Sequence, residues 1–389
     1  KLHIVYAKAK EAEGQFAEAV KFYTSGGDMN SVVRILLYKL NNPAQAIEIV
    51  KNSQSAESAV QIAQYCQEKA NFKLAIEFYV MAEKFDQAFE IALVHEEMSV
   101  YSELIKNSSH SKNLYQVIAE YYEGKGDFIN AGDFFVKCAI YERALKLYLQ
   151  CGEKAVEKAI DTVGFAKDET LTHQLVDFLM GDVDGIIKEP KHIFRLYMVL
   201  GNYAEATKTA LLIAKQEQEN GNYSVAHSFL LQTHKDLISR NVYVSTELRK
   251  TLMLVHSYLI IKELAAFDDT SLSARMLIRV AKNVSKFPAH IVPILTSTVI
   301  QCYKANLKIS AYEYASVVVR PEYKQKLSAQ MKKTITDILR KKKPNETQSD
   351  ELLAPCPYCK FKVPESELDC PSCKNMLPFC IASGNHMII

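Results

Sequence analysis

Apolar and polar residues follow helical spacing along the chain, and one arrangement of them recurs every 56 residues. Each copy has a small residue two positions before an aromatic residue and an alanine three positions after that aromatic residue. The copies read AKAKEAEGQFAEAVKFY from Ala7, AQYCQEKANFKLAIEFY from Ala63 and AEYYEGKGDFINAGDFF from Ala119. A fixed period of this length is typical of stacked helical repeats.

The aligned positions predict helical hairpins. The small residue lets the chain turn between two helices, the aromatic residue packs the second helix on the first, and the alanine allows a close approach. These positions are Gly14, Ala70 and Gly126, then Phe16, Phe72 and Phe128, then Ala19, Ala75 and Ala131. Because an isolated helix pair cannot bury both of its faces, we expect the pairs to stack into a tetratricopeptide-like α-solenoid.

Looser copies continue beyond the third repeat. Gly201 to Ala206 and Gly221 to Ala226 keep the order small residue, aromatic residue, alanine but lose the period. Later apolar runs predict helices over Ser245 to Phe267, Ser271 to Val284, Pro288 to Tyr303 and Ser310 to Val319. We therefore expect an all-α solenoid over residues 1–340, with no strand in it.

Composition agrees with a helical, folded chain. Its 389 residues include 13 Gly and 11 Pro, about half the usual share, which is too few for a turn-rich β fold. The net charge of +2 is too balanced for a dedicated nucleic-acid binder. Without a secretory signal or a convincing membrane span, we expect a soluble, cytoplasmic protein. Since the sequence begins at Lys1 in what reads as mid-helix, we also expect a fragment of a longer chain.

The composition changes near the end of the sequence. Residues 341–354 are polar, contain a proline and lack an apolar period, so they predict a flexible linker. Residues 355–389 hold five of the nine cysteines. The other four, in apolar helical surroundings, are interpreted as structural core residues: Cys66, Cys138, Cys151 and Cys302.

Two cysteine pairs predict a metal site. Cys356 and Cys359, then Cys370 and Cys373, each stand in the pattern Cys-Pro-x-Cys-Lys. Two such turns supply four thiolates in the tetrahedral arrangement that zinc prefers. A disulfide pair fits an intracellular chain poorly, and a redox motif would stand singly at the start of a helix. We therefore predict a closed, structural Zn²⁺ site in a module too small to bury its own core.

Cys380 and His386 also have side chains that bind metals, but the sequence supplies no further partners for them. The simpler interpretation is a buried thiol and a surface imidazole. The alternative is half of a second, incomplete metal site.

The helical repeats, the two Cys-Pro-x-Cys turns and the stretch from Pro378 to Met387 together resemble the C-terminal part of the WD-repeat subunits of intraflagellar transport complex A. The resemblance covers the repeats and the tail, and its specific part is the tail. It implies β-propellers before the solenoid and further Cys-x-x-Cys turns after it. Those turns would complete a second zinc site with Cys380 and His386.

This resemblance implies a non-enzymatic scaffold subunit that supports complex assembly, retrograde ciliary transport and the ciliary entry of membrane-receptor cargo. The implied partners are the other subunits of complex A and the cargo or its tubby-like adaptor. The implied locations are the cytoplasm and the cilium, including its base and axoneme.

Two other functions stay open at this point. A vesicle-coat or tethering subunit has the same solenoid and zinc-tail architecture. A ubiquitin ligase would need eight interleaved zinc ligands, whereas this tail shows four and two. An enzyme is disfavoured because the sequence contains no Walker loop, His-Glu-x-x-His or Gly-x-Ser-x-Gly motif, and we predict neither catalytic nor organic-cofactor residues.

Two further features concern charge and histidine. Residues 321–343 predict one amphipathic helix with eight basic side chains against Glu322 and Asp337, a net charge of +6. We interpret its basic face as solvated, with contact to anionic lipid headgroups or an acidic partner as the sharper hypothesis. His227 and His234 stand seven residues apart on one helix face, where packed or exposed imidazoles are favoured over metal ligands.

Overall fold

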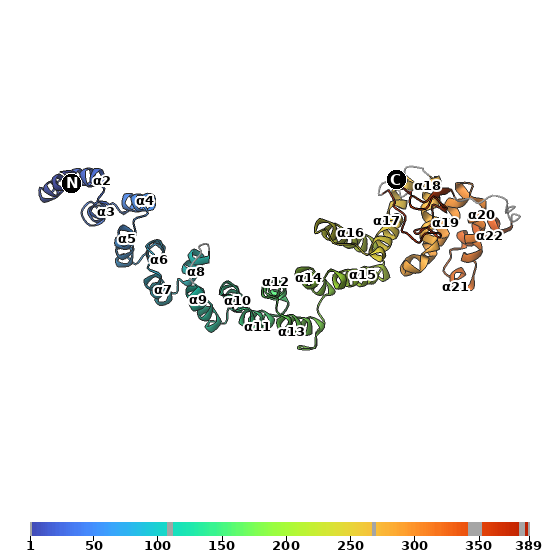
Figure 1. The fold of residues 1–389 in the computed structure, drawn as a ribbon, viewed down its shortest axis with the longest axis horizontal. Helices are drawn as coiled ribbons and strands as arrows, with labels where there is room; N and C mark the ends of the chain where they lie inside the picture. The colour runs from blue at the N-terminus through green and yellow to red at the C-terminus, as the bar shows by residue number, and fades with distance from the viewer. Residues whose placement is uncertain (1, 107–111, 267–269, 341–351, 381–385, 388–389) are drawn as a thin grey trace. The chain divides into compact units, whose positions relative to one another are not determined.

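The computed structural model describes residues 2–106, 112–266, 270–340, 352–380 and 386–387. Contacts between residues divide the chain into two compact units, residues 1–155 and 156–389. Figure 1 shows each unit as helices that follow one another in chain order, and most of them pack on the next. The predicted all-α solenoid is confirmed. Among the described helices, none is both long enough and apolar enough to cross a lipid bilayer.

The first unit contains the three regular repeats. The first repeat forms α1 (Leu2–Ala12), α2 (Phe16–Gly26), α3 (Met29–Tyr38) and α4 (Pro43–Ser53). The second forms α5 (Ala56–Glu68), α6 (Phe72–Met81), α7 (Phe85–Val94) and α8 (Met98–Lys106). The third forms α9 (Lys112–Gly124), α10 (Phe128–Lys137), α11 (Tyr141–Gln150) and the 3-10 helix η1 (Gly152–Ala155). Each period therefore begins with a hairpin whose two helices pack along their length.

The 56-residue register is visible in the backbone. Gly14, Ala70 and Gly126 all adopt the left-handed conformation, with φ of +78°, +56° and +79°. The next helix begins two residues later at the aromatic position in every repeat. The alanines three residues further on are completely buried, namely Ala19, Ala75 and Ala131. The small residue thus turns the chain, and the alanine lets the two helices approach closely.

The second unit is a series of helices followed by a small β-hairpin. It begins with α12 (Val156–Ala166), α13 (Glu169–Met180), α14 (Pro190–Leu200), α15 (Tyr203–Glu219) and α16 (Tyr223–Ser239). It continues with α17 (Thr246–Ala266), α18 (Thr270–Lys282), η2 (Val284–Lys286), η3 (Pro288–His290), α19 (Ile291–Lys304) and α20 (Lys308–Val318). It ends with α21 (Pro321–Lys324), α22 (Ala329–Arg340), β1 (Leu353–Pro355) and β2 (Lys362–Pro364).

The prediction of one helix over residues 321–343 is wrong. The segment forms α21 and α22, with a break before Ala329. The Ser328 Oγ accepts a hydrogen bond from the Met331 backbone N–H at 3.3 Å, so it caps the start of α22. A serine offers the backbone a cap in place of a continuing helix, which the apolar spacing did not reveal. Residues 341–343 lie outside the described residues.

The predicted linker, residues 341–354, lies mostly outside the described residues. Its last two residues, Leu353 and Ala354, belong to β1, which pairs with β2 in antiparallel register. These residues pair because the turn at the first cysteine pair brings Lys362–Pro364 back beside them. The division into solenoid, linker and zinc module stays a prediction.

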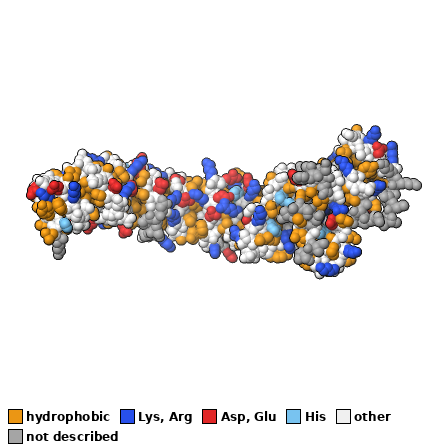
Figure 2. Space-filling view, turned by 90° about the horizontal axis from the view of Figure 1, so that it is seen from above, with side chains coloured by type: hydrophobic (Ala, Val, Ile, Leu, Met, Phe, Trp, Pro, Cys, Tyr) orange, Lys and Arg blue, Asp and Glu red, His pale blue; other side chains and the backbone are white. Residues whose placement is uncertain are grey.

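The surface carries both signs of charge. On the face shown in Figure 2, basic and acidic side chains are interspersed along the chain. This agrees with the net charge of +2.

The packing of α15 gives a direct test of the solenoid register. Ala206 is completely buried in the helical core, whereas Ala204 on the same helix is exposed. Replacing Ala206→Leu forces extra carbon into a closely packed contact, so we expect a loss of about 1–3 kcal/mol in the free energy of unfolding. Ala204→Leu makes the same change at the surface and should stay within about 0.5 kcal/mol of the parent chain. Urea unfolding followed by circular dichroism measures both, and equal effects would contradict the register.

Candidate metal centre

Each Cys-Pro-x-Cys-Lys turn forms the same backbone loop. The Lys360 N–H donates to the Cys356 carbonyl, and the Lys374 N–H donates to the Cys370 carbonyl, both at 2.9 Å. Lys360 and Lys374 both adopt the left-handed conformation, with φ of +63° and +61°. The same chain reversal therefore occurs twice, and each reversal turns its two cysteines toward one point.

The four sulfur atoms come together. The Sγ atoms of Cys356, Cys359, Cys370 and Cys373 all lie within 4.8 Å of one another. The Sγ atoms of Cys356 and Cys373 are 3.7 Å apart, and those of Cys359 and Cys370 are 3.5 Å apart. These separations exceed a disulfide bond of about 2.05 Å but match the edge of a tetrahedron with zinc–sulfur bonds of about 2.3 Å.

The charges in this cluster favour a cation. Burial raises the pKa of Cys370, but hydrogen bonds from the backbone N–H groups of Cys373 and Ser372 and from the Cys359 side chain bring it down to about 7. A backbone hydrogen bond from Asn375 lowers the pKa of Cys373, but burial and the neighbouring cysteines raise it to about 11. Four adjacent sulfurs cannot all ionise without a positive charge among them. A soft divalent cation supplies that charge, so the cluster fits a zinc module.

The module has a very small core of its own. Its buried residues are Cys356, Val363, Cys370, Leu377 and Phe379, and they pack against Met253 of α17. Two of these five are predicted metal ligands. The module is therefore too small to fold by burial alone, and it relies on the cysteine cluster and on the solenoid.

Arg279 of α18 joins the module to the solenoid. Its side chain is completely buried, and its Nη2 donates to the Glu365 carbonyl of the module at 2.6 Å. Its Nη1 donates to Ser257 Oγ of α17 at 3.2 Å, and its guanidinium carbon lies 4.4 Å from the centre of the Phe379 ring. Burial lowers the pKa of Arg279 to about 10, so the side chain stays charged at neutral pH.

Two lysines surround this buried contact. Lys282 of α18 donates to Ser366 Oγ at 2.6 Å and pairs with Glu367 at 3.0 Å. Lys250 of α17 pairs with Asp369 at 2.5 Å. The module is thus attached to two successive helices at three points.

Arg279 was not predicted from the sequence. Its position in the sequence is the one indication of its burial. Arg279 stands three residues after Met276 and one before Val280, and both of these are buried on the apolar stripe of α18. A lone charged residue inside such a stripe indicates either a buried partner or an edge position, and the sequence does not distinguish between them.

Cys380 and His386 lie beside the module. His386 Nε2 is 3.1 Å from the Glu367 carbonyl oxygen, and its ring lies 4.8 Å from that of Phe379. Burial lowers the pKa of His386. In the part of the chain that the structure describes, neither residue belongs to a group of three or more potential ligands. The second metal site stays a prediction.

His227 and His234 lie half-buried on α16. His227 Nε2 is 3.0 Å from Nδ1 of His256 on α17, a neighbour that the sequence spacing did not reveal. Burial, and for His227 also the neighbouring His256, lowers the pKa of both residues. Among the described residues, they too fall outside any group of three potential ligands.

Residues 1–238, more than half of the chain, match the family model described as the IFT140/IFT172 TPR domain. The chain belongs to this family. Residues 350–374, which include all four clustered cysteines, match the model described as the IFT144 first zinc finger domain. The two matches fall on the helical stack and on the cysteine module, as the sequence resemblance implies.

Curated relatives match over the whole chain. The chain is 45% identical to WD repeat-containing protein 19 of Mus musculus and 46% identical to WD repeat-containing protein 19 of Homo sapiens, covering 100% of this chain and 29% of each relative. It is 37% identical to WD repeat-containing protein dyf-2 of Caenorhabditis elegans, covering 28% of that protein. The chain thus spans less than a third of the length of these relatives, and the sequence resemblance is confirmed.

A solved circular tandem repeat protein aligns with 87% of this chain and 86% of its own, at 13% identity and a TM-score of 0.14. So low a score carries no structural argument.

The role of Arg279 is tested by replacing Arg279→Met, which keeps a long side chain but removes the hydrogen bonds across the interface. We expect the module contact to lose about 1–3 kcal/mol, because the Glu365 carbonyl is left without its donor. Hydrogen exchange followed by mass spectrometry should show faster exchange in β1 and β2. Arg320→Met, at an exposed position, is the matched control. Unchanged exchange in the Arg279 variant would show that the lysine pairs alone hold the module.

Proposed function

We propose that this chain is a non-enzymatic scaffold segment of a subunit of intraflagellar transport complex A. The family match and the relatives named WD repeat-containing protein 19 support this assignment. The observation that carries it is the attachment of the cysteine module to the solenoid through buried Arg279. A rigidly held module at the end of a helical stack provides a fixed docking surface, which suits assembly.

The proposed partners are the other subunits of complex A, together with ciliary membrane-receptor cargo or its tubby-like adaptor. The proposed roles are complex assembly, retrograde transport and the entry of that cargo into the cilium. The corresponding locations are the cytoplasm, the ciliary base and the axoneme. The relatives named WD repeat-containing protein 19 and the shared family support the assignment to complex A, and the finer roles extend it.

The cofactor in this proposal is one structural Zn²⁺ ion held by Cys356, Cys359, Cys370 and Cys373. When bound, the ion neutralises the thiolates and cross-links the two cysteine turns. The protein contributes the backbone N–H groups that point toward the sulfurs and the interface that fixes the module on α17 and α18.

In the proposed function, the basic face of α22 is a second contact surface. Lys332, Lys333 and Arg340 are exposed on α22, whereas Ile335 and Ile338 are buried. One face of α22 is therefore available to an acidic partner or to anionic lipid headgroups. In the proposed function this face supports contact close to a membrane.

The metal assignment predicts about one zinc ion per purified chain. Removing it with a chelator should expose β1 and β2 to hydrogen exchange while the helical circular dichroism signal is kept, because the helices have their own core. Elemental analysis and hydrogen exchange measure the two effects.

Two variants make this test specific. Cys370→Ser should reduce the zinc content to less than half an ion per chain. Cys380→Ser should leave it near one, since the proposed set of four is complete without Cys380. A zinc-free chain with four reactive thiols at the predicted ligand positions would contradict the metal assignment.

The scaffold assignment is tested by recovering tagged chain from ciliated cells and identifying the bound proteins by mass spectrometry. We expect subunits of complex A, and we expect severalfold less of them with Arg279→Met, because the docking surface is then loosened. Arg320→Met serves again as the control. Recovery of vesicle-coat or tethering subunits in place of complex A would support the alternative function and overturn this one.

A further inference from the structure

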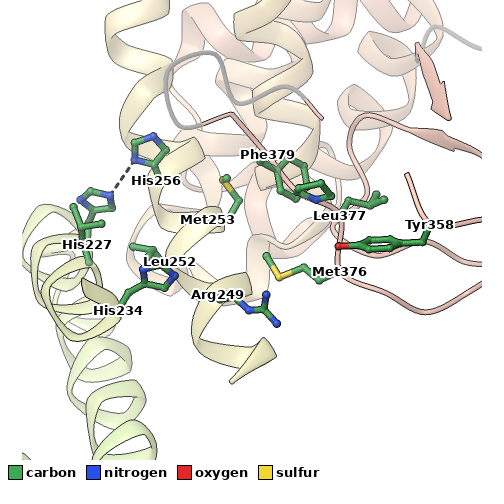
Figure 3. A pocket seen from close by; sticks show the side chains of 12 residues that line it. His227, His234, Arg249, Leu252, Met253, His256, Tyr358, Met376, Leu377 and Phe379 are labelled. Carbon is green, nitrogen blue, oxygen red and sulfur yellow. Dashed lines mark hydrogen bonds between the residues drawn. The ribbon is translucent and has the colours of Figure 1, made fainter. Parts of the chain in front are cut away.

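A cavity of about 290 Å³ lies between the solenoid and the cysteine module. Side chains of α16 and α17 line one side of it, and residues of the module line the other (Figure 3). The module's contribution is Tyr358 and the segment from Met376 to Phe379. The cavity therefore exists only while the module is folded and attached to α17 and α18.

Most of its surface is apolar. Seven of the twelve lining residues are Leu, Met, Pro or Phe side chains. Met253 of α17 and Met376 of the module face it from opposite sides. Methionine is flexible and polarizable, so a cavity lined by two of them adapts to apolar side chains of different shapes.

The charge of the lining has one sign. None of the twelve described lining residues is acidic, and Arg249 of α17 carries a permanent positive charge. Its Nε is buried and has no hydrogen-bond partner among the described residues. Its guanidinium carbon lies 5.8 Å from the centre of the Tyr243 ring. A buried donor of this kind is costly unless a ligand satisfies it.

The imidazoles of His227 and His234 add no charge to the cavity lining. Burial lowers the pKa of His227 and His234, so both are neutral at neutral pH and neither repels an apolar group. His227 is engaged with His256, at the end of the cavity away from the module (Figure 3). The recognition elements are therefore an apolar chamber and one guanidinium at its edge.

We propose that this cavity binds a segment of a partner protein that inserts one or two apolar side chains and places a neighbouring Asp or Glu carboxylate on Arg249. A carboxylate suits Arg249 because guanidinium and carboxylate form charge-assisted hydrogen bonds. A protein segment suits the volume of the cavity, about 290 Å³, because this is at the lower limit for small-molecule pockets and is enough to hold one or two anchoring side chains. The choice of a protein as ligand rests on the proposed scaffold function.

The probe for this proposal is a displayed library of random dodecapeptides, selected on the zinc-loaded chain. We expect enriched peptides to carry an aromatic or aliphatic residue next to Asp or Glu. Synthetic peptides of the enriched sequences should bind Arg249→Glu at least tenfold more weakly than the parent chain, measured by fluorescence anisotropy. Met376→Trp, which fills the cavity from the module side, should weaken binding to a similar extent.

The matched control is Lys235→Glu, which makes the same charge reversal at an exposed position of α16 outside the cavity lining. It should bind the peptides within twofold of the parent chain. Circular dichroism and zinc content, equal to those of the parent, establish that each variant is folded.

The proposal is overturned if the enriched peptides lack acidic residues, or if they bind Arg249→Glu as well as they bind the parent chain. It is also overturned if laurate binds in an Arg249-dependent way while peptides do not, because the cavity would then be a fatty-acid site. If the chain binds no peptides but complex A subunits are still recovered with it, only the cavity proposal is wrong. If the chain binds peptides but no complex A subunits are recovered with it, the proposed scaffold function is wrong instead.

Discussion

The attachment of the cysteine module to α17 and α18 depends on the buried guanidinium of Arg279. A charged side chain with no exposed surface is stable only when hydrogen bonds and a favourable ring contact replace its water. Arg279 obtains them from Ser257 on the solenoid and from Glu365 and Phe379 on the module. Arg279 can therefore be buried in this way only when α17, α18 and the module are packed together. The cavity beside Arg249 is a consequence, because the same attachment places Met376 opposite Met253.

The helical stack and the module are stabilised in different ways. A helix pair buries its second face by packing on the next pair, and buried alanines such as Ala75 and Ala131 make that contact close. The module has too few apolar residues to do this, so the cluster of four cysteines, which fits a zinc module, and the buried Arg279 take the place of a larger core.

The sequence predicts the structural features that repeat along the chain and those formed by residues close together in it. The turn at Gly126, the helix start at Phe128 and the buried Ala131 follow from periodicity alone. The cysteine cluster follows from spacing, because each pair shares one tight turn. The break before Ala329 was missed because a serine cap does not disturb the apolar spacing of residues on either side. Arg279 and His256 were missed because their partners, Glu365 and His227, lie 86 and 29 residues away along the chain, and no local pattern encodes those contacts.

The most direct measurement is X-ray diffraction from crystals of the zinc-loaded chain, with data collected on both sides of the zinc absorption edge. We expect one strong anomalous peak about 2.3 Å from each Sγ of Cys356, Cys359, Cys370 and Cys373. We also expect the module to pack on α17 and α18, with Arg279 bonded to the Glu365 carbonyl. A map with no peak among these sulfurs would contradict the metal site. A module separated from α18, with Arg279 in solvent, would show that the buried arginine does not join the module to the solenoid.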